Sequence, residues 1–127
     1  MQNMALSGVR VLDVSAVLAA PVTATFLGDF GADVVKVEEP RIGDFTRGRA
    51  NEQGGRSPQW LQEARNKKSV TLNLRTKRGQ AILRDMIPHF DVMVTNYRPP
   101  TLEKWGMSPA ELQTIHPEGI FVFLTGY

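Results

Sequence analysis

The sequence contains no cysteine among its 127 residues, which excludes a disulfide scaffold and a metal site built on thiolates. Its two histidines, His89 and His116, stand far apart and have no companions at ligand spacing, so we expect no metal. No apolar run approaches the ~20 residues that span a bilayer. Residues 1–8 also lack the apolar segment of a secretory signal. These absences predict a cytoplasmic protein that is not inserted in a membrane.

An excess of charge of one sign is lacking too, because the 15 lysines and arginines are nearly balanced by 13 acidic residues, which leaves a net charge of +2. This balance permits an anionic ligand but does not require nucleic acid. The sequence shows no helix-turn-helix, zinc finger or aromatic-studded RNA-binding strand. We therefore expect no nucleic-acid partner.

The chain does contain regularly alternating strand-like and helix-like segments. Apolar or alternating patterns predict strands at residues 9–14, 34–37, 69–74, 91–97 and 119–127. Helices are predicted within residues 16–31 and 59–66, after the cap Thr76, and after the capping box that begins at Ser108. Strands that alternate with helices predict an α/β fold, in which a mostly parallel sheet carries helices on both faces.

The turn after the first predicted strand has no glycine. Residues 13–21 read DVSAVLAAP, whereas a dinucleotide-binding turn needs G-x-G-x-x-G so that the backbone can approach a pyrophosphate. The phosphate-loop motif G-x-x-x-x-G-K-[ST] is also missing. Ordinary NAD binding is therefore not expected, although Glu38 and Glu39 follow the second strand, where a ribose-binding carboxylate would stand.

Arginines stand at the carboxyl ends of two predicted strands. Arg75 follows the third strand and Arg98 follows the fourth. Ligands of open parallel sheets bind at this edge, and arginine pairs well with phosphate oxygens. Most other basic residues are interpreted as solvated surface. The aspartates are given structural interpretations, at strand or helix ends or in a loop: Asp13, Asp29, Asp33, Asp44, Asp85 and Asp91.

Four longer segments occur in a recognisable order: LSGVRVLDVSAVLAAPVTATFLGDFGADVVKVEEPRIGDFTRG, RNKKSVTLNL, DVMVTNYRPPTLEKWGM and HPEGIFVFLTGY. Together they closely resemble the N-terminal part of the class III CoA-transferase family. That family includes formyl-CoA transferase, the carnitine CoA-transferase and the related α-methylacyl-CoA racemase. The resemblance covers nearly the whole chain and is specific for the family, but it does not indicate a substrate.

The resemblance implies a Rossmann-like large domain, of which residues 1–127 are the N-terminal CoA-binding portion. The rest of that domain and a smaller domain would then be absent. It also implies an interlocked homodimer that moves CoA from an acyl-CoA to a carboxylic acid. In the transferases an aspartate attacks the thioester and forms covalent intermediates. That aspartate lies beyond Tyr127 in the family, so no catalytic residue is assigned here and the chain alone is expected to be inactive.

The resemblance further implies CoA contacts at four places. They are the turn after the first strand (Val17, Leu18, Ala19), the end of the second (Glu39), the end of the third (Leu72, Asn73, Leu74, Arg75), and the end of the fourth with the segment after it (Asn96, Tyr97, Arg98, Lys104). The second and third places approach the adenine nucleotide, the fourth contacts nucleotide, pantetheine and a phosphate, and the first lines the path near the reacting centre. Leu18 replaces a glutamine of some transferases, and Glu39 replaces an arginine of some relatives, so two polar contacts are lost.

Two alternatives stay open. An acyl-CoA racemase of the same superfamily would transfer a proton at the α-carbon with acid and base side chains. A non-enzymatic fragment would bind CoA weakly, or would only pack against other protein. Residues 65–74 favour a transferase.

Overall fold

The computed structural model describes residues 3–48 and 57–126. Its centre is a five-stranded sheet in the order β3-β2-β1-β4-β5, and every neighbouring pair is parallel. The strands are β1 (Arg10–Val14), β2 (Asp33–Glu38), β3 (Lys67–Thr71), β4 (Val92–Thr95) and β5 (Ile120–Phe123). The predicted parallel α/β architecture is therefore confirmed.

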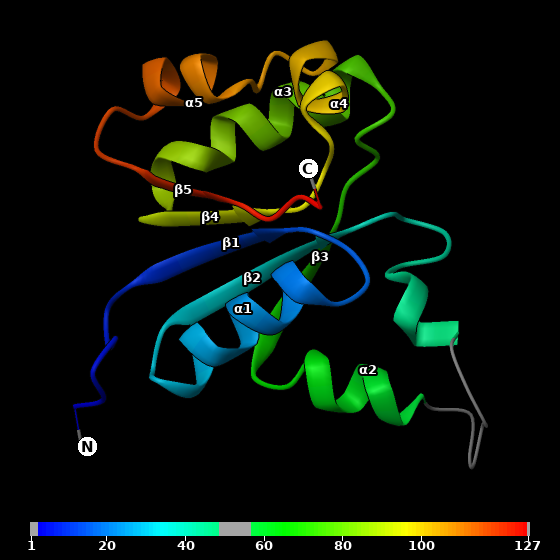
Figure 1. The fold of residues 1–127 in the computed structure, drawn as a ribbon, viewed down its shortest axis with the longest axis vertical. Coiled ribbons are helices and arrows are strands. Elements are labelled where there is room, and N and C mark those ends of the chain that lie inside the picture. Colours follow the sequence, from blue (N-terminus) through cyan, green and yellow to red (C-terminus); the bar gives the residue numbers. More distant parts are fainter. Residues whose placement is uncertain (1–2, 49–56, 127) are drawn as a thin grey trace.

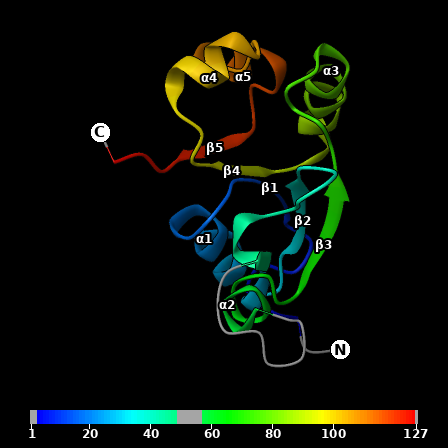
Figure 2. The same ribbon diagram turned by 90° about the vertical axis from the view of Figure 1, so that its right-hand side faces the viewer.

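Helices cover both faces of this sheet (Figure 1). One face carries α1 (Ala19–Asp29) and α2 (Pro58–Glu63), and the other carries α3 (Lys77–Met86), α4 (Pro99–Lys104) and α5 (Pro109–Ile115). The perpendicular view separates the two helical layers clearly (Figure 2). Short 3₁₀ turns, η1 (Phe45–Gly48) and η2 (Ile87–His89), complete the described elements.

Each face of the sheet has its own hydrophobic core. Leu12, Leu83 and Leu112 belong to a cluster that includes residues of α3 and α5, whereas Val11 and Val34 pack with the alanines of α1. Adjacent residues of β1 thus contribute to opposite cores, because successive strand side chains point to opposite faces. This explains why β1 is apolar at consecutive positions rather than at alternate ones.

Local signals fix several helix ends as predicted. Thr76 accepts a hydrogen bond from Gly79 N and begins α3, and Ser108 and Glu111 form a reciprocal capping box at α5. Gly31 follows α1 with a φ of 105°, a left-handed conformation that glycine adopts without strain. Within the described residues, no helix combines the length and apolarity needed to cross a membrane.

Several elements differ from the sequence-based expectation. β4 and β5 end at Thr95 and Phe123, short of the predicted residues 97 and 127. β3 ends at Thr71 rather than at residue 74, because Leu72 N makes a last bond to Glu38 O at 2.8 Å and Asn73 then turns the chain. Helix α4 was not predicted. It begins at Pro99 and Pro100, since proline is tolerated in a first turn, where its missing N–H has no intrahelical partner in any case.

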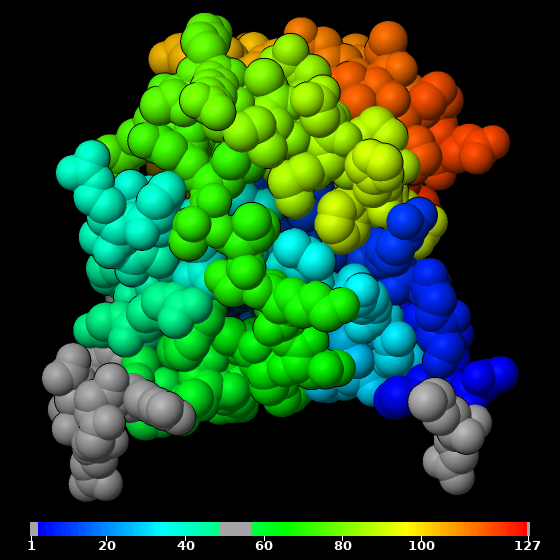
Figure 3. Space-filling model, turned by 180° about the vertical axis from the view of Figure 1, so that it is seen from behind, coloured from blue at the N-terminus to red at the C-terminus, as the bar shows by residue number. Residues whose placement is uncertain are grey.

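β3 is the edge strand beside β2. Seen from behind, the green segments around β3 form much of that surface (Figure 3). Lys68 and Thr71 of β3 are exposed. The carboxyl ends of all the strands lie along one edge because every pair is parallel, and the candidate site lies at that edge.

Candidate functional site

The order of the strands reverses between β1 and β4, and such a switch point is where open α/β sheets bind ligands. Here the side chain of Asn96, which follows β4, bridges to Ala16, which follows β1. Ala16 N donates to Asn96 Oδ1 at 3.0 Å, and Asn96 Nδ2 donates to Ala16 O at 2.8 Å. The amide therefore fixes the backbone of the glycine-free turn.

The next residue of that turn is strained. Val17 has a φ of 74°, although a β-branched residue disfavours the left-handed region by more than the ~1–2 kcal/mol typical of an L-residue. Such a conformation persists only where its surroundings over-determine it. Val17 is 37% exposed and Leu18 is 51% exposed, and Ala19 begins α1. The three predicted turn residues thus lie on an accessible, rigidly held turn at the switch point.

A cavity of about 260 Å³ opens beside this turn, on the side of β2 and β3. Its lining residues come from the ends of β1 to β4, from the loop after β2 and from the end of α4: Ala16, Val37, Glu38, Glu39, Ile42, Gly43, Phe45, Leu72, Asn73, Leu74, Arg75, Tyr97 and Trp105. We call it the first cavity. It brings together six of the predicted residues, namely Glu39, Leu72, Asn73, Leu74, Arg75 and Tyr97.

Two aromatic rings form one wall of the first cavity. The rings of Tyr97 and Trp105 meet edge to face, with 4.8 Å between centroids. Burial and the negative charge of Asp44 raise the pKa of Tyr97 above 10.0, so its hydroxyl stays protonated at neutral pH. Sequence analysis missed Trp105, because its position depends on the unpredicted helix α4.

A second cavity, of about 580 Å³, lies between the ends of β4 and β5. It is lined by Asn96, Arg98, Pro99, Pro100, Leu124, Thr125 and Gly126. Consecutive residues after β4 therefore serve different cavities: Asn96 and Arg98 line the second, and Tyr97 lines the first. Lys104, at the end of α4, is exposed and lines neither cavity.

The carboxylate of Glu39 is already engaged by its own loop. Glu39 Oε2 accepts hydrogen bonds from Arg41 N at 3.2 Å and from Ile42 N at 3.1 Å. It closes the loop that carries Ile42 and Phe45 over the cavity. These two apolar side chains are 71% and 60% exposed, and sequence analysis did not select them.

Glu38 is the other glutamate of the pair, and it is buried. It receives two hydrogen bonds from Arg47, at 2.6 and 2.7 Å, one from Ser69 Oγ, and one from Asp44 N at 2.9 Å. Burial raises the pKa of Glu38, but the hydrogen bonds from Arg47, Ser69 and Asp44 outweigh it and lower the pKa to about 2. The guanidinium carbon of Arg47 also lies 3.8 Å from the centre of the Trp60 ring. Glu38 is thus a structural anion that anchors the loop.

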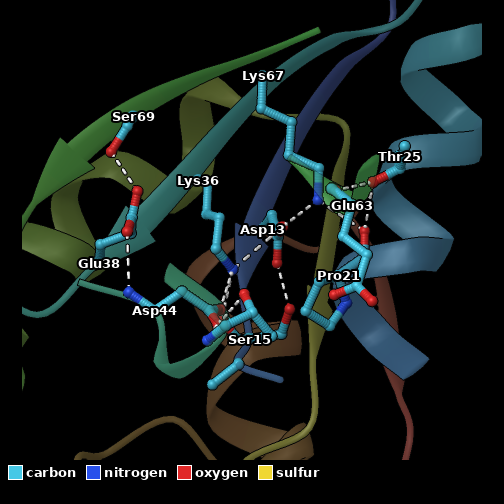
Figure 4. Close-up of polar contacts among 12 residues, drawn as sticks. Asp13, Ser15, Pro21, Thr25, Lys36, Glu38, Asp44, Glu63, Lys67 and Ser69 are labelled. Carbon is cyan, nitrogen blue, oxygen red and sulfur yellow. Dashed lines mark hydrogen bonds and ion pairs between the residues drawn. The ribbon is translucent and has the colours of Figure 1, made fainter. Parts of the chain in front are cut away.

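A buried charged network lies beneath the switch point (Figure 4). Asp13 in β1 is 0% exposed, and its Oδ2 lies 3.6 Å from Lys36 Nζ and 2.8 Å from Lys67 Nζ. Lys36 Nζ also lies 3.0 Å from Asp44 Oδ2. Lys67 donates a second bond to Pro21 O at 2.6 Å. Burial lowers the pKa of Lys67, and the neighbouring Asp13 partly offsets this.

Sequence analysis gave Asp13 and Asp44 structural roles but did not connect them to each other. The available signal was Lys36 itself, a charge within the apolar run Val34–Val37. A lysine there is buried only when paired, and the parallel register places Lys36 directly opposite Asp13. Within residues 3–48 and 57–126, no group of three or more acidic, histidine or cysteine side chains is arranged to hold a metal ion.

Comparison with known proteins identifies the family. Residues 6–127 match the profile of CoA-transferase family III. The chain belongs to CoA-transferase family III. The family resemblance inferred from the sequence is therefore confirmed. Membership of this family also agrees with a Rossmann-like sheet that lacks the glycines of a dinucleotide-binding turn.

Known CoA-transferases align with nearly the whole of the chain. It is 47% identical over 127 residues to the beta subunit of succinyl-CoA–L-malate CoA-transferase from Chloroflexus aurantiacus, covering 98% of this chain and 31% of that protein. It is 38% identical to formyl-CoA:oxalate CoA-transferase from Afipia carboxidovorans, covering 97% of this chain and 29% of the relative. The chain thus spans about a third of the length of these relatives.

The fold of this family III member matches a solved structure of the same kind. A CAIB/BAIF family protein from Brucella suis superposes with a TM-score of 0.88 at 34% sequence identity, over 99% of this chain and 34% of the other. The five parallel strands and their helices therefore correspond to one part of a larger fold.

Proposed function

We propose that residues 1–127 are the N-terminal CoA-binding portion of a class III CoA-transferase. The enzyme would move CoA from an acyl-CoA to a carboxylic acid through a covalent aspartyl intermediate. The observation that carries this proposal is the first cavity, which gathers strand-end residues at the switch point of a chain that belongs to family III. The relatives named above are themselves CoA-transferases acting on acyl-CoA and carboxylate pairs.

The chemistry of the two cavities suits a CoA ester. The first cavity offers the aromatic faces of Tyr97 and Trp105 to a flat or apolar part of the ligand. Arg75 at its rim and Arg98 at the second cavity are exposed and can pair with phosphate oxygens. Lys104 contributes positive charge nearby as an exposed residue.

The aspartyl nucleophile is proposed to come from a part of the enzyme other than this chain. Asp13 and Asp44 are the buried aspartates of the described residues. Both are ion-paired with Lys36. A carboxylate that is fully buried and held by lysines cannot approach a thioester, so neither residue fits the role of nucleophile. Because the chain spans about a third of the length of its relatives, we propose a longer enzyme that forms an interlocked homodimer in the cytoplasm.

The decisive experiment uses the full-length protein with an acyl-CoA donor and a panel of carboxylic acids. Chromatography of the CoA esters should show a new acyl-CoA formed at the expense of the donor, and mass spectrometry should trap CoA or acyl groups on an aspartate. No exchange with any acceptor would contradict the transferase assignment. Deuterium from the solvent at the α-carbon of the donor, without exchange, would instead identify a racemase.

A second experiment addresses binding by the 127-residue chain alone. Isothermal titration calorimetry with CoA, on a chain whose circular dichroism shows folded α/β structure, should give saturable binding if the cavities are preformed. A folded chain that releases no heat with CoA would show that the site needs the rest of the enzyme.

A further inference from the structure

Lys36 is the most buried long cation of the described chain, and it contacts two carboxylates and one backbone carbonyl. The residue is 1% exposed. Its ammonium lies 3.0 Å from Asp44 Oδ2 and 3.6 Å from Asp13 Oδ2, and it donates to Ser15 O at 2.8 Å. The ammonium is thus held by one hydrogen bond, to Ser15 O, and by two ion-pair contacts, with Asp44 and Asp13 (Figure 4).

These partners belong to two segments that form opposite walls of the first cavity. Ser15 directly precedes Ala16, which lines the cavity from the β1 turn. Asp44 stands between Gly43 and Phe45, which line it from the loop after β2. Lys36 itself does not line the cavity. The Lys36 ammonium therefore contacts the backbone of Ser15 beside one wall and the side chain of Asp44 beside the other, from outside the cavity.

Further hydrogen bonds fix Asp44 and Ser15, the two residues through which Lys36 is linked to the walls. Asp44 uses its other oxygen to accept from Thr46 N at 2.9 Å and from Thr46 Oγ1 at 2.8 Å, which fixes the loop at the start of η1. On the other side, Ser15 Oγ donates to Asp13. Asn96 holds Ala16 one residue further along. A movement of Lys36 would therefore change the spacing of the two walls rather than the position of one side chain.

We propose that Lys36, through Asp44, is a positioning residue for the CoA ester: it sets the distance between the β1 turn and the loop of residues 39–48. This inference rests on the proposed function, because it concerns the same cavity. Lys36 does not touch the ligand, and it acts by holding the ligand's walls at the productive spacing. Misplacement of binding groups by about 1 Å can cost up to ~100-fold in an enzyme's efficiency.

The test compares four variants of the full-length protein. Asp44→Asn keeps the shape of the side chain and weakens its pairing with Lys36, Lys36→Met removes the ammonium, and the double variant removes both charges together. Val34→Ala is the control: Val34 lies on the same face of β2 as Lys36, two residues earlier and further from the cavity end of the strand, and is 1% exposed. It lowers stability by creating a core cavity without touching either wall.

Calorimetry with CoA and steady-state kinetics give the readout. D44N is expected to raise the dissociation constant of CoA and the KM for the acyl-CoA by about tenfold, with the KM for the carboxylic acid unchanged. K36M should do at least as much, and K36M/D44N should be no worse than K36M, since the two residues act as one unit. V34A should lower the melting temperature and retain the CoA affinity of the unmodified protein.

The possible failures are distinguishable. Unmodified full-length protein that does not bind CoA would overturn the proposed function, and the positioning role with it. Unmodified protein that binds CoA, together with a D44N variant of equal affinity, would overturn the positioning role alone. Equal losses in D44N and V34A would do the same, because they would trace the effect to stability. If K36M does not fold, D44N and V34A still decide the question.

Discussion

The side-chain amide of Asn96 forms a two-way hydrogen-bonded pair with the backbone of Ala16, at 3.0 and 2.8 Å. It continues the pairing of β1 and β4 just past the last paired residues, Val14 and Thr95. Because Asn96 also lines the second cavity, one residue both closes the switch point and faces the candidate ligand. The strained φ of Val17 follows directly after this clamp.

Replacing Asn96 with alanine is expected to remove both bonds and leave the polar groups of Ala16 partly buried. The free energy of unfolding should fall by ~1–3 kcal/mol, and CoA affinity should fall with it as the turn loosens. Urea unfolding and calorimetry measure the two effects. Asn66→Ala is the control, because Asn66 donates to Gly28 O at 3.0 Å far from both cavities. A loss of CoA affinity in that variant as well would contradict a local role for Asn96.

Replacing Gly79 with alanine should displace the residues after β3 that line the first cavity. A Cβ at this position would lie 2.0 Å from Asn73 O, and a backbone atom cannot move aside without shifting the Asn73–Arg75 wall. Overpacking of this kind costs ~1–3 kcal/mol or more, so melting temperature and CoA affinity should both fall. Ala81→Gly in the same helix is the control. It costs ~1 kcal/mol through helix propensity alone, and it should leave CoA affinity unchanged.

Glu38 makes the free energy of unfolding depend on pH in the acidic range. Its pKa falls from 4.5 to about 2 on folding, so the unfolded chain binds its proton more readily. The stabilisation is fully present above pH 4.5 and is lost as the pH falls from 4.5 through about 2. The shift corresponds to roughly 3 kcal/mol. Asp44, whose pKa is also lowered despite its burial, adds a loss below pH 3.8.

Urea unfolding of the wild type and of Glu38→Gln at several pH values between 2 and 7 tests this. The variant should be less stable at pH 7, because a neutral glutamine cannot form an ion pair with Arg47. Its stability should also change less between pH 4.5 and 2 than that of the wild type. Identical slopes for the two proteins in that range would show that Glu38 does not carry the effect.

Arg98→Ala with Lys104→Ala should mainly raise the KM for the CoA ester in the full-length enzyme. No ion pair involves either side chain within residues 3–48 and 57–126, so both are available to an anionic ligand. One charge-assisted hydrogen bond contributes ~1.5–3 kcal/mol, which corresponds to a rise of roughly ten- to a hundredfold for each contact made. Lys77→Ala with Arg78→Ala, exposed residues of α3 that line neither cavity, is the matched control. An unchanged KM in the first variant would show that Arg98 and Lys104 are solvated surface.

Local sequence signals predicted most of the fold. The Thr76 cap, the Ser108 capping box and Gly31 marked helix ends correctly, because each acts through bonds to residues within about four positions. The alternation of Val70, Leu72 and Leu74 predicted a strand over residues 69–74, whereas β3 both begins and ends earlier, at Lys67–Thr71. Leu72 and Leu74 instead line the first cavity, so their apolar character serves the site rather than the strand. Two consecutive prolines concealed α4, and with it the position of Trp105.

The sequence by itself determined the strands, most helix ends, the parallel α/β class and, through its ordered motifs, the family. It also selected the strand ends that carry the candidate ligand contacts. Only the tertiary structure decided which cavity each contact faces, since neighbouring residues after β4 point to opposite sides. It alone brought Asp13, Lys36, Asp44 and Lys67 together. These charges are far apart in the chain, and they can be buried only when each lies beside a counter-charge. The register of β1, β2 and β3 brings them together, so the pairing exists only in the folded sheet.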